Sequence, residues 1–563
     1  MTRGTRRLVA GAAAVVVAVS AAACSTEEDR VPSIGYAVNG PITTYNAGST
    51  EGAYSAARQA LSRVLPGFSM IGPGGTAVAD TDIGTVTEVP GQQQVLTYAF
   101  APAAVWSDGV PMTCDDLVLA WAARRGTTET SGTAFDAAET AGYSDIERID
   151  CVPSQKEATV TFRADRPLVD RESLFGPGTI LPAHVAARTA GVPDVTSTLA
   201  GGDADAVGRL AEAWNTGWTL PSGAVDPAVF AASGPFRVES FSADDGLVLV
   251  PNDNWWGVPA QTDRIVVWPS GIDLAEKASS GDVEVVDLPG GAAAPDGFAA
   301  AAQPSFGVEQ LIFATSGVFV DPAARRAVAS CVPRTALFDA HGHPGYDAET
   351  GRGSGVVDSR VMLPGTLPYR SVAAVAADRY RTTDVAAVTA GLAQAGLTDP
   401  TVRIGYRGPD SRRAAIVADI AAACGPLGVD VVDASSDTLS PLALRAGEVD
   451  VLLAGTAGGF GPTGTATPGS ARTALLGGQN ANLGGYANGR VDELLNRLAV
   501  DGSDATALSA GTDVERILWD DLPTLPLWNV PVVTATASGM RGVDANPSVA
   551  GAGWNMDKWV FVR

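Results

Sequence analysis

Positive charge is scarce in this sequence: 38 Lys and Arg stand against 62 Asp and Glu, for a formal net charge of −24. So anionic a chain is repelled by phosphate backbones, which argues against nucleic acid as a partner. Histidine is scarcer still, with three residues. His341 and His343 flank a glycine, but without a nearby Cys they form at best part of a metal site, and a solvated loop is the simpler interpretation. We expect no bound metal.

Catalytic motifs are also missing. The sequence has no Gly-x-Ser-x-Gly elbow, no His-Glu-x-x-His helix and no phosphate-binding loop ending in Gly-Lys. Acidic residues are numerous, but no spacing singles out a catalytic pair. We therefore expect neither an enzyme nor a cofactor.

Long apolar runs are absent, apart from one at residues 8–23, which follows three arginines. This run is shorter than the roughly 20 residues that a transmembrane helix needs. Residues 1–23 therefore read as a signal peptide. Its removal takes away three arginines and leaves 35 − 62 = −27. The remaining chain of more than 500 residues is long enough for two or three globular domains.

The signal peptide ends in Ala-Ala-Ala followed by Cys24. This stretch resembles the bacterial lipobox, in which the cysteine sulfur receives a diacylglycerol, although Ala21 departs from the usual leucine. The resemblance implies that Cys24 is lipidated, that residues 24–32 form a polar tether, and that the protein is anchored to the outer face of the cell membrane. Ordinary cleavage after Ala23, which would free a soluble protein, is the alternative.

The mature chain alternates strand and helix signals, which predicts an α/β fold. Strands are expected at 34–38, 96–100 and 158–162, a helix at 53–65, and a hairpin around Asp245-Gly246. Thr113 and Asp116 have the spacing of a capping box. From Asp321 onward we expect helices at 322–328, 384–395 and 411–424 and strands at 402–406, 429–432 and 449–453. The proline-rich segment 525–563 does not look like a self-contained domain. We expect it to return to the N-terminal part of the chain and complete the first of two lobes.

Several of these segments, taken in chain order, resemble the peptide and nickel class of ABC-transporter substrate-binding proteins, solute-binding protein family 5. No single segment is decisive, but their collinear order argues against chance. The segments are Val105 to Gly109 before Thr113, Gly234 to Phe236, Asn252 to Gly257, Asp321 to Val328, Ala393 to Gly396, Gly447 to Val451, and Gly485 to Asn488 with Val491 to Leu495.

The resemblance implies a two-lobed, periplasmic-binding-protein-like α/β fold of class II (cluster C) type, with two connecting strands and an extra β-rich subdomain in the first lobe. The expected boundaries are 33–64, 218–320 and 525–563 for a discontinuous first lobe, 65–217 for the subdomain and 321–524 for the second lobe. An oxidising compartment permits disulfides among Cys114, Cys151, Cys331 and Cys424 in three connectivities. Pairing Cys114 with Cys151 and Cys331 with Cys424 keeps each pair within one lobe; unpaired buried thiols are the alternative.

The expected ligand loop departs from the family pattern. Peptide binders of the family have a Trp and then an Asp that pairs with the peptide's α-ammonium, where this sequence has Thr456 and Gly459. A charge-assisted contact worth roughly 1.5–3 kcal/mol is then missing unless another acid supplies it. The residues expected to line the cleft are Tyr45, Asn46, Gly458, Gly459, Phe460 and Tyr486.

The resemblance implies a monomeric, extracytoplasmic lipoprotein that captures an oligopeptide or related polar ligand. Its partners would be the permease and ATPase subunits of an ABC importer. The alternative is an envelope lipoprotein of the same fold with a regulatory or scaffolding role in glycolipid assembly.

Overall fold

The computed structural model describes residues 1–2, 32–53, 55–73, 76–126, 135–138, 140–288, 292–342, 355–362, 364, 366–455 and 474–562. The expected lipidation site Cys24 and the predicted ligand-loop residues Gly458, Gly459 and Phe460 lie outside these residues. Within the described part of the chain, no helix has both the length and the apolar character needed to cross a membrane.

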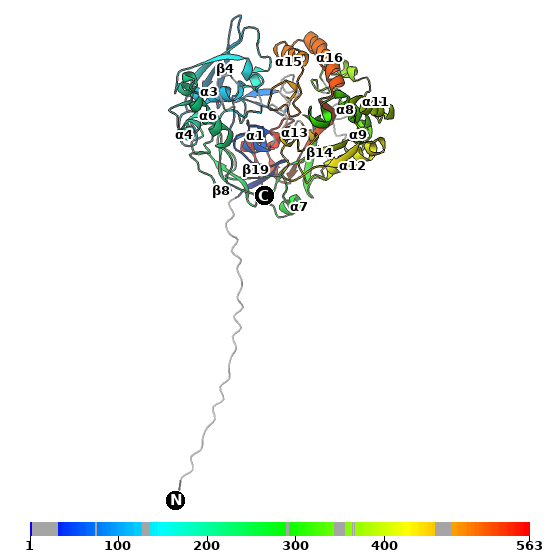
Figure 1. Ribbon diagram of the computed structural model, residues 1–563. Helices are drawn as coiled ribbons and strands as arrows, with labels where there is room; N and C mark the ends of the chain where they lie inside the picture. Colours follow the sequence, from blue (N-terminus) through cyan, green and yellow to red (C-terminus); the bar gives the residue numbers. More distant parts are fainter. Residues whose placement is uncertain are drawn as a thin grey trace.

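An eleven-stranded sheet runs through the whole molecule in the order β15-β14-β16-β13-β17-β12-β1-β11-β10-β9-β8. One side of the molecule is formed mainly by the first half of the chain and the other by the second half, as the colours of Figure 1 show. The strands are β1 Ile34–Ala37, β8 Gly223–Ala224, β9 Phe236–Ser242, β10 Gly246–Pro251, β11 Ile265–Trp268, β12 Val285–Leu288, β13 Phe298–Phe313, β14 Thr401–Gly405, β15 Asp430–Asp433, β16 Val451–Gly455 and β17 Thr524–Ala537.

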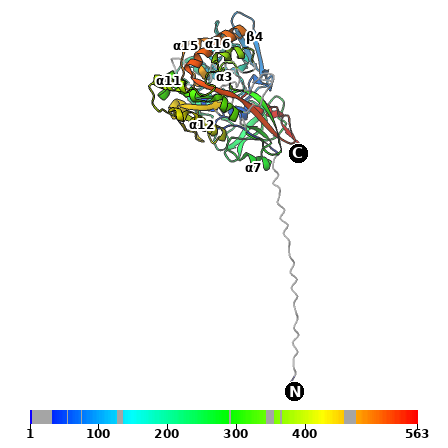
Figure 2. The ribbon, with the colours of Figure 1, turned by 90° about the vertical axis from the view of Figure 1, so that its right-hand side faces the viewer.

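The two longest strands, β13 and β17, connect the two lobes. One part of this antiparallel pair borders β12 in the first lobe, and the other part borders β16 in the second. Figure 2 shows the red β17 crossing the molecule. Pro304 lies opposite Pro531, and the register shifts between Pro304 and Val308. Since proline has no N–H to donate, the ladder is weakened where it passes between the lobes.

The first lobe is built around β1, which runs parallel to both β11 and β12. The C-terminal segment returns to this lobe: the Trp559 ring packs edge-on against Tyr36 with ring centroids 5.2 Å apart. Asp287 of β12 accepts hydrogen bonds from the Tyr36 hydroxyl, from Thr534 Oγ1 at 2.8 Å and from the Ala552 amide at 2.9 Å. Burial raises the pKa of the Asp287 carboxyl, and these donors oppose that effect.

A second, four-stranded sheet lies in the segment 65–217, in the order β4-β5-β7-β6. Helix α3, Cys114–Arg124, begins with the predicted capping box of Thr113 and Asp116. A disulfide joins Cys114 to Cys151 at the end of β6. The strands are β4 Gly84–Val89, β5 Val95–Phe100, β6 Ile146–Cys151 and β7 Glu157–Phe162, and the remaining helices of this segment are α4 Ala183–Ala190, α5 Val195–Gly201 and α6 Ala204–Thr216.

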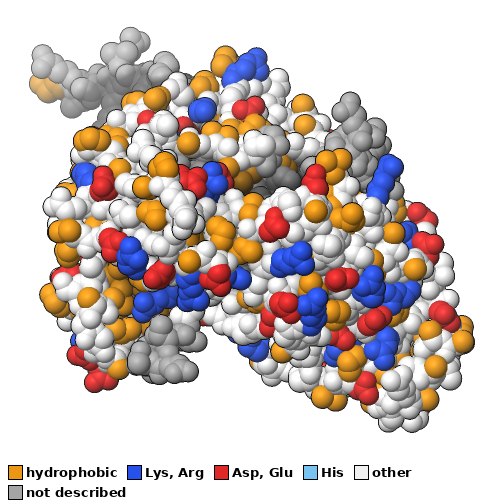
Figure 3. Space-filling view, turned by 90° about the horizontal axis from the view of Figure 1, so that it is seen from above, with side chains coloured by type: hydrophobic (Ala, Val, Ile, Leu, Met, Phe, Trp, Pro, Cys, Tyr) orange, Lys and Arg blue, Asp and Glu red, His pale blue; other side chains and the backbone are white. Residues whose placement is uncertain are grey.

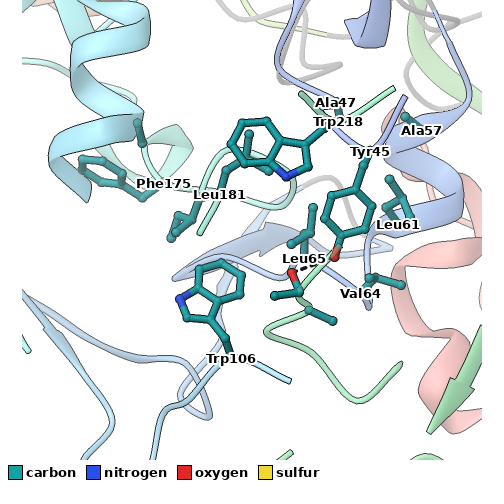
Figure 4. Close-up of a cluster of buried hydrophobic side chains, with 14 of the residues drawn as sticks. Tyr45, Ala47, Ala57, Leu61, Val64, Leu65, Trp106, Phe175, Leu181 and Trp218 are labelled. Atoms are coloured by element: carbon teal, nitrogen blue, oxygen red, sulfur yellow. Dashed lines mark hydrogen bonds between the residues drawn. The ribbon is translucent and has the colours of Figure 1, made fainter. Parts of the chain in front are cut away.

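This segment shares one hydrophobic core with the rest of the first lobe. Figure 4 shows Trp106 and Leu181 of the segment beside Tyr45, Leu61 and Trp218, all of them members of one buried cluster. The segment is therefore packed against the rest of the first lobe through a shared core.

The second lobe has its own cores. Helix α8, Pro322–Cys331, begins after the N-cap Asp321 and packs with α11, Val385–Ala395, and α12, Ser411–Cys424, over β14 and β16. A disulfide joins Cys331 to Cys424, the last residues of α8 and α12. A further core lies between α15, Gly489–Val500, and α16, Asp504–Asp521.

Two local predictions were wrong. Instead of one helix over 53–65, the chain forms α1, Thr50–Ala53, and α2, Ala57–Leu61, as two short helices. The Asp245-Gly246 dipeptide is typical of a two-residue hairpin turn, but in the hairpin of β9 and β10 Ser242 lies opposite Gly246, so three residues lie between the paired positions. Gly246 adopts a φ of +74°, which favours glycine at this position.

Candidate ligand-binding cleft

The two lobes bring the carboxyl ends of parallel strands toward each other. In the first lobe β1 ends at Ala37, and in the second lobe the parallel strands β14 and β16 end at Gly405 and Gly455. Ligands of open α/β sheets bind beyond such strand ends. Seen from above, the surface is hollowed near its centre and carries both acidic and basic side chains around the hollow (Figure 3). The candidate cleft therefore lies between these two edges.

A buried acid from a connecting strand holds two arginines at this edge. Glu309 of β13 is 1 % exposed and lies opposite Gly455 of β16. Arg412 Nη2 donates to Glu309 Oε2 at 2.7 Å, and Arg413 Nε donates to Oε1 at 3.1 Å. Both arginines lie in the first turn of α12, whose N-cap Asp410 accepts from the Arg413 amide at 2.9 Å.

The charges of this cluster set its electrostatics. Burial alone raises the pKa of the Glu309 carboxyl, but the positive charges of Arg413 and Arg412, with their hydrogen bonds, outweigh burial and lower it to about 2. Glu309 is therefore an anion at neutral pH. Together with Asp410 it balances the two arginines, so the cluster is a set of polar groups with little net charge.

The arrangement can offer donors to a ligand oxygen. The Arg412 and Arg413 side chains are 17 % and 23 % exposed. Each guanidinium has five N–H groups, and Glu309 engages only part of them. The first side-chain carbon of a residue at Gly455 would lie 3.9 Å from Arg413 Nη2, so the cluster stands where the chain enters the predicted ligand loop.

Tyr45 and Asn46 occupy the first lobe, but their side chains serve its packing. Both residues are 0 % exposed. The Tyr45 hydroxyl donates to the Ala231 carbonyl at 2.9 Å, and its ring packs edge-on against Phe230. Asn46 Nδ2 donates to the Trp214 carbonyl at 2.8 Å. Neither residue therefore exposes any surface to the cleft in this structure.

Tyr486 occupies the second lobe and is also part of a core. It is 5 % exposed, and its hydroxyl donates to Asp521 Oδ2 at 2.7 Å. Burial and this acidic partner raise the pKa of the Tyr486 phenol. The structure therefore does not gather Tyr45, Asn46 and Tyr486 into one cluster, and each is held by contacts within its own lobe.

Glu309, Arg412 and Arg413 were missed in the sequence. Two signals could have found them. Arg412 and Arg413 are adjacent basic residues directly after the helix cap Asp410, and Glu309 is a charged residue in an otherwise largely apolar strand. Neither signal reveals that the acid and the arginines meet.

Of the two histidines considered as metal ligands, His341 has another partner. His341 Nε2 lies 2.8 Å from Asp419 Oδ2 on α12, and His343 lies outside the described residues. Among the residues that the structure describes, the one group with metal-ligand spacing is Cys114, Asp115 and Cys151, whose cysteines form a disulfide.

Two lobes, two connecting strands and a cleft at opposed strand ends define a periplasmic-binding-protein-like fold. The solved oligopeptide-binding protein AppA of Bacillus subtilis, in complex with a nonapeptide, has the same architecture, with a TM-score of 0.71, 13 % identity, and coverage of 94 % of this chain and 100 % of that chain.

Residues 88–473 match the sequence profile described as "Bacterial extracellular solute-binding proteins, family 5 Middle". The chain belongs to this family of extracytoplasmic binding proteins. It is 40 % identical over 564 residues, covering 99 % of this chain and 97 % of its relative, to a Mycobacterium tuberculosis protein named "Uncharacterized lipoprotein Rv2585c". It is also 29 % identical over 202 residues, 35 % of this chain and 26 % of the relative, to the "Probable monoacyl phosphatidylinositol tetramannoside-binding protein LpqW" of M. tuberculosis.

Proposed function

We propose that this protein is the substrate-binding lipoprotein of an ABC importer and captures a small polar ligand, an oligopeptide or a related molecule, between its two lobes. The observation that carries the proposal is the polar cluster at the carboxyl edge of β14 and β16, in which Glu309 of the connecting strand β13 holds Arg412 and Arg413 of α12. Membership of the solute-binding family supports it. Permease and ATPase subunits would receive the ligand.

The decisive experiment is to identify what occupies the cleft of the mature protein purified from its native host. Native mass spectrometry should find a peptide or similar polar molecule, and calorimetry with a peptide library should give heat of binding. Glycolipid alone, together with no heat from any peptide, would rule out peptide import.

The ligand loop gives a sharper test. If Gly459 stands where related peptide binders have their ammonium-binding acid, Gly459→Asp should tighten the binding of free-amine peptides by about tenfold or more, since a charge-assisted hydrogen bond contributes roughly 1.5–3 kcal/mol. N-acetylated peptides of the same sequence should gain nothing. Equal effects on both peptides would show that residue 459 does not face the amino terminus.

The second candidate function is a role in envelope glycolipid assembly with the same fold. The similarity to LpqW, whose name describes binding of a mannosylated phosphatidylinositol, favours it. Co-purified glycolipid and retention of its binding in a strain without the importer would support this role. Binding of peptide alone would contradict it.

Anchoring through Cys24 is a separate part of the proposal. Cys24→Ser should move the protein from the membrane fraction to the medium or the soluble extracytoplasmic fraction, because lipid attachment requires the cysteine sulfur. A variant with Ser25→Ala keeps that sulfur and should stay with the membrane. Equal fractionation of both variants would contradict the anchor.

A further inference from the structure

The two lobes touch each other at a second place, distant in sequence from the connecting strands. Two pieces of the 65–217 segment reach the second lobe there. One, at Ala137 and Ala138, meets the 479–481 turn; the other, at Arg166 and Val169, meets α15, which is labelled near the upper edge of Figure 1. We call this contact the interlobe seam. It consists of Ala137, Ala138, Thr140, Arg166 and Val169 on the first lobe and Gln479, Asn480, Ala481, Asn496, Ala499 and Gly502 on the second.

The first half of the seam is a short piece of chain held on two sides. The Ala138 amide donates to the Gly48 carbonyl of the loop after β1 at 3.1 Å. The Ala138 carbonyl accepts from the Ala481 amide, also at 3.1 Å, and the Ala137 carbonyl accepts from Asn480 Nδ2 at 2.9 Å. Backbone bonds to both lobes thus fix this piece between them.

The neighbouring residues strengthen this half. Thr140 Oγ1 donates to Gln479 Oε1 across the seam. On the side of the second lobe, Arg445 at the end of α13, Ala443–Ala446, donates from Nη2 to the Asn480 carbonyl. The 479–481 turn is therefore held in place by its own lobe before it meets the first.

The second half of the seam joins a positioned arginine to α15. Arg166 Nε donates to Asp145 Oδ1 at 2.9 Å, which fixes the guanidinium, and Arg166 Nη2 donates to Asn496 Oδ1 on α15 at 2.9 Å. The Val169 amide donates to the Ala499 carbonyl at 3.3 Å. A side chain at Gly502 would begin 2.9 Å from Val169 Cγ1, so either Val169 would have to shift or the two surfaces would have to move apart.

These contacts have a mechanical consequence. The ladder between β13 and β17 is weakened at Pro304 and Pro531, which provides a place for bending. Any rotation that opens the cleft there must separate Ala137 and Ala138 from the 479–481 turn and Arg166 from α15. We propose that the interlobe seam is a latch that holds the cleft closed and sets the rate at which it opens.

A closed cleft would also retain its ligand. That consequence rests on the proposed function, whereas closure of the cleft by the latch does not. The test therefore measures closure of the mature full-length protein without any added ligand. Hydrogen exchange followed by mass spectrometry reports opening at peptides that cover 137–141, 166–170 and 478–482, and small-angle X-ray scattering reports the radius of gyration.

Two independent variants weaken the latch. Asn480→Ala with Asn496→Ala removes one interlobe hydrogen bond from each half, and Gly502→Leu inserts a wedge against Val169. Each should speed exchange at the seam peptides by about tenfold or more. The first variant loses two interlobe hydrogen bonds, each of which favours the closed form severalfold, and the second pushes Val169 away from residue 502. The radius of gyration should rise, while peptides of the lobe cores should keep their exchange rates.

Each variant has a matched control. Asn254 donates from Nδ2 to the Ser107 carbonyl at 2.8 Å within the first lobe, so Asn254→Ala removes the same kind of bond away from the seam. Gly489 at the start of α15 has open space around it, so Gly489→Leu adds the same side chain without a wedge. Both controls should match the wild type.

Unchanged seam exchange and an unchanged radius of gyration in both latch variants would overturn the proposal, as would equal acceleration in the controls. Faster exchange in every peptide of one variant would show that this variant has lost global stability. The seam exchange of the other variant would then test the latch. If the latch variants open as expected but the wild type binds neither peptide nor glycolipid, the proposed function fails and the latch stands.

Discussion

Glu309→Gln tests whether the buried acid on the connecting strand holds Arg412 and Arg413 in place. The carboxyl pKa falls from 4.5 to about 2 in the folded protein. One pKa unit corresponds to about 1.4 kcal/mol, so the carboxylate contributes about 3 kcal/mol to stability at pH 7. Removing one partner of a buried ion pair has a cost of the same size, about 3–5 kcal/mol, because the arginines lose their counter-charge. The substitution keeps the side-chain shape and removes the charge.

The sign of the pH dependence follows from the lowered pKa. The stabilisation is complete above pH 4.5 and is lost as the pH falls toward 2, because the unfolded chain then binds the proton more readily than the folded one. In urea unfolding, the difference between wild type and Glu309→Gln should shrink from about 3 kcal/mol at pH 7 to about 1 kcal/mol at pH 3.

The matched control is Glu239→Gln. Glu239 pairs with Arg264 at 2.9 Å, but the two side chains are 44 % and 31 % exposed, so solvent screens the pair. The loss should be below about 1 kcal/mol at pH 7. A Glu309→Gln variant as stable as this control at pH 7 would refute the reasoning, since the buried carboxylate would then carry no net interaction.

Two further predictions concern the two lobes. Trp559 is 0 % exposed and packs against Tyr36, so Trp559→Ala should lower the free energy of unfolding by about 3–5 kcal/mol. Trp554 is more exposed, so Trp554→Ala should lower it much less. Equal losses would contradict the role of the C-terminal segment in the first core. The Cys331 to Cys424 disulfide spans 93 residues, so replacing both cysteines by serine should lower the free energy of unfolding in urea by about 4–5 kcal/mol. A loss below about 1 kcal/mol would show that the second-lobe core alone keeps these helix ends together.

Local signals in the sequence predicted local structure well. Asp321 and Pro322 marked the start of α8, and the capping box of Thr113 and Asp116 marked the start of α3. Helix α12 ends at Cys424, as the following glycine indicated. Caps and helix ends are predictable because the interacting groups lie within four residues of each other.

The candidate site was less predictable. Tyr45 and Asn46 follow the first strand, as a ligand loop should, yet both side chains are buried in the first lobe. The sequence cannot tell a tyrosine that faces the cleft from one that faces the core, because that choice depends on which segments pack against the loop. Here the segments are distant: Ala231 accepts the Tyr45 hydroxyl hydrogen bond across 186 residues.

By itself, the sequence predicted the α/β alternation and the family, and its composition shows the scarcity of positive charge. Each of these depends on residue type and short spacing alone. Only the tertiary structure decided that Glu309 meets Arg412, 103 residues away, and that Arg166 meets Asn496, 330 residues away. Such pairs depend on the order of strands in the sheet and on how the two lobes close on each other. Both depend on packing of the whole chain, which no short stretch of sequence encodes.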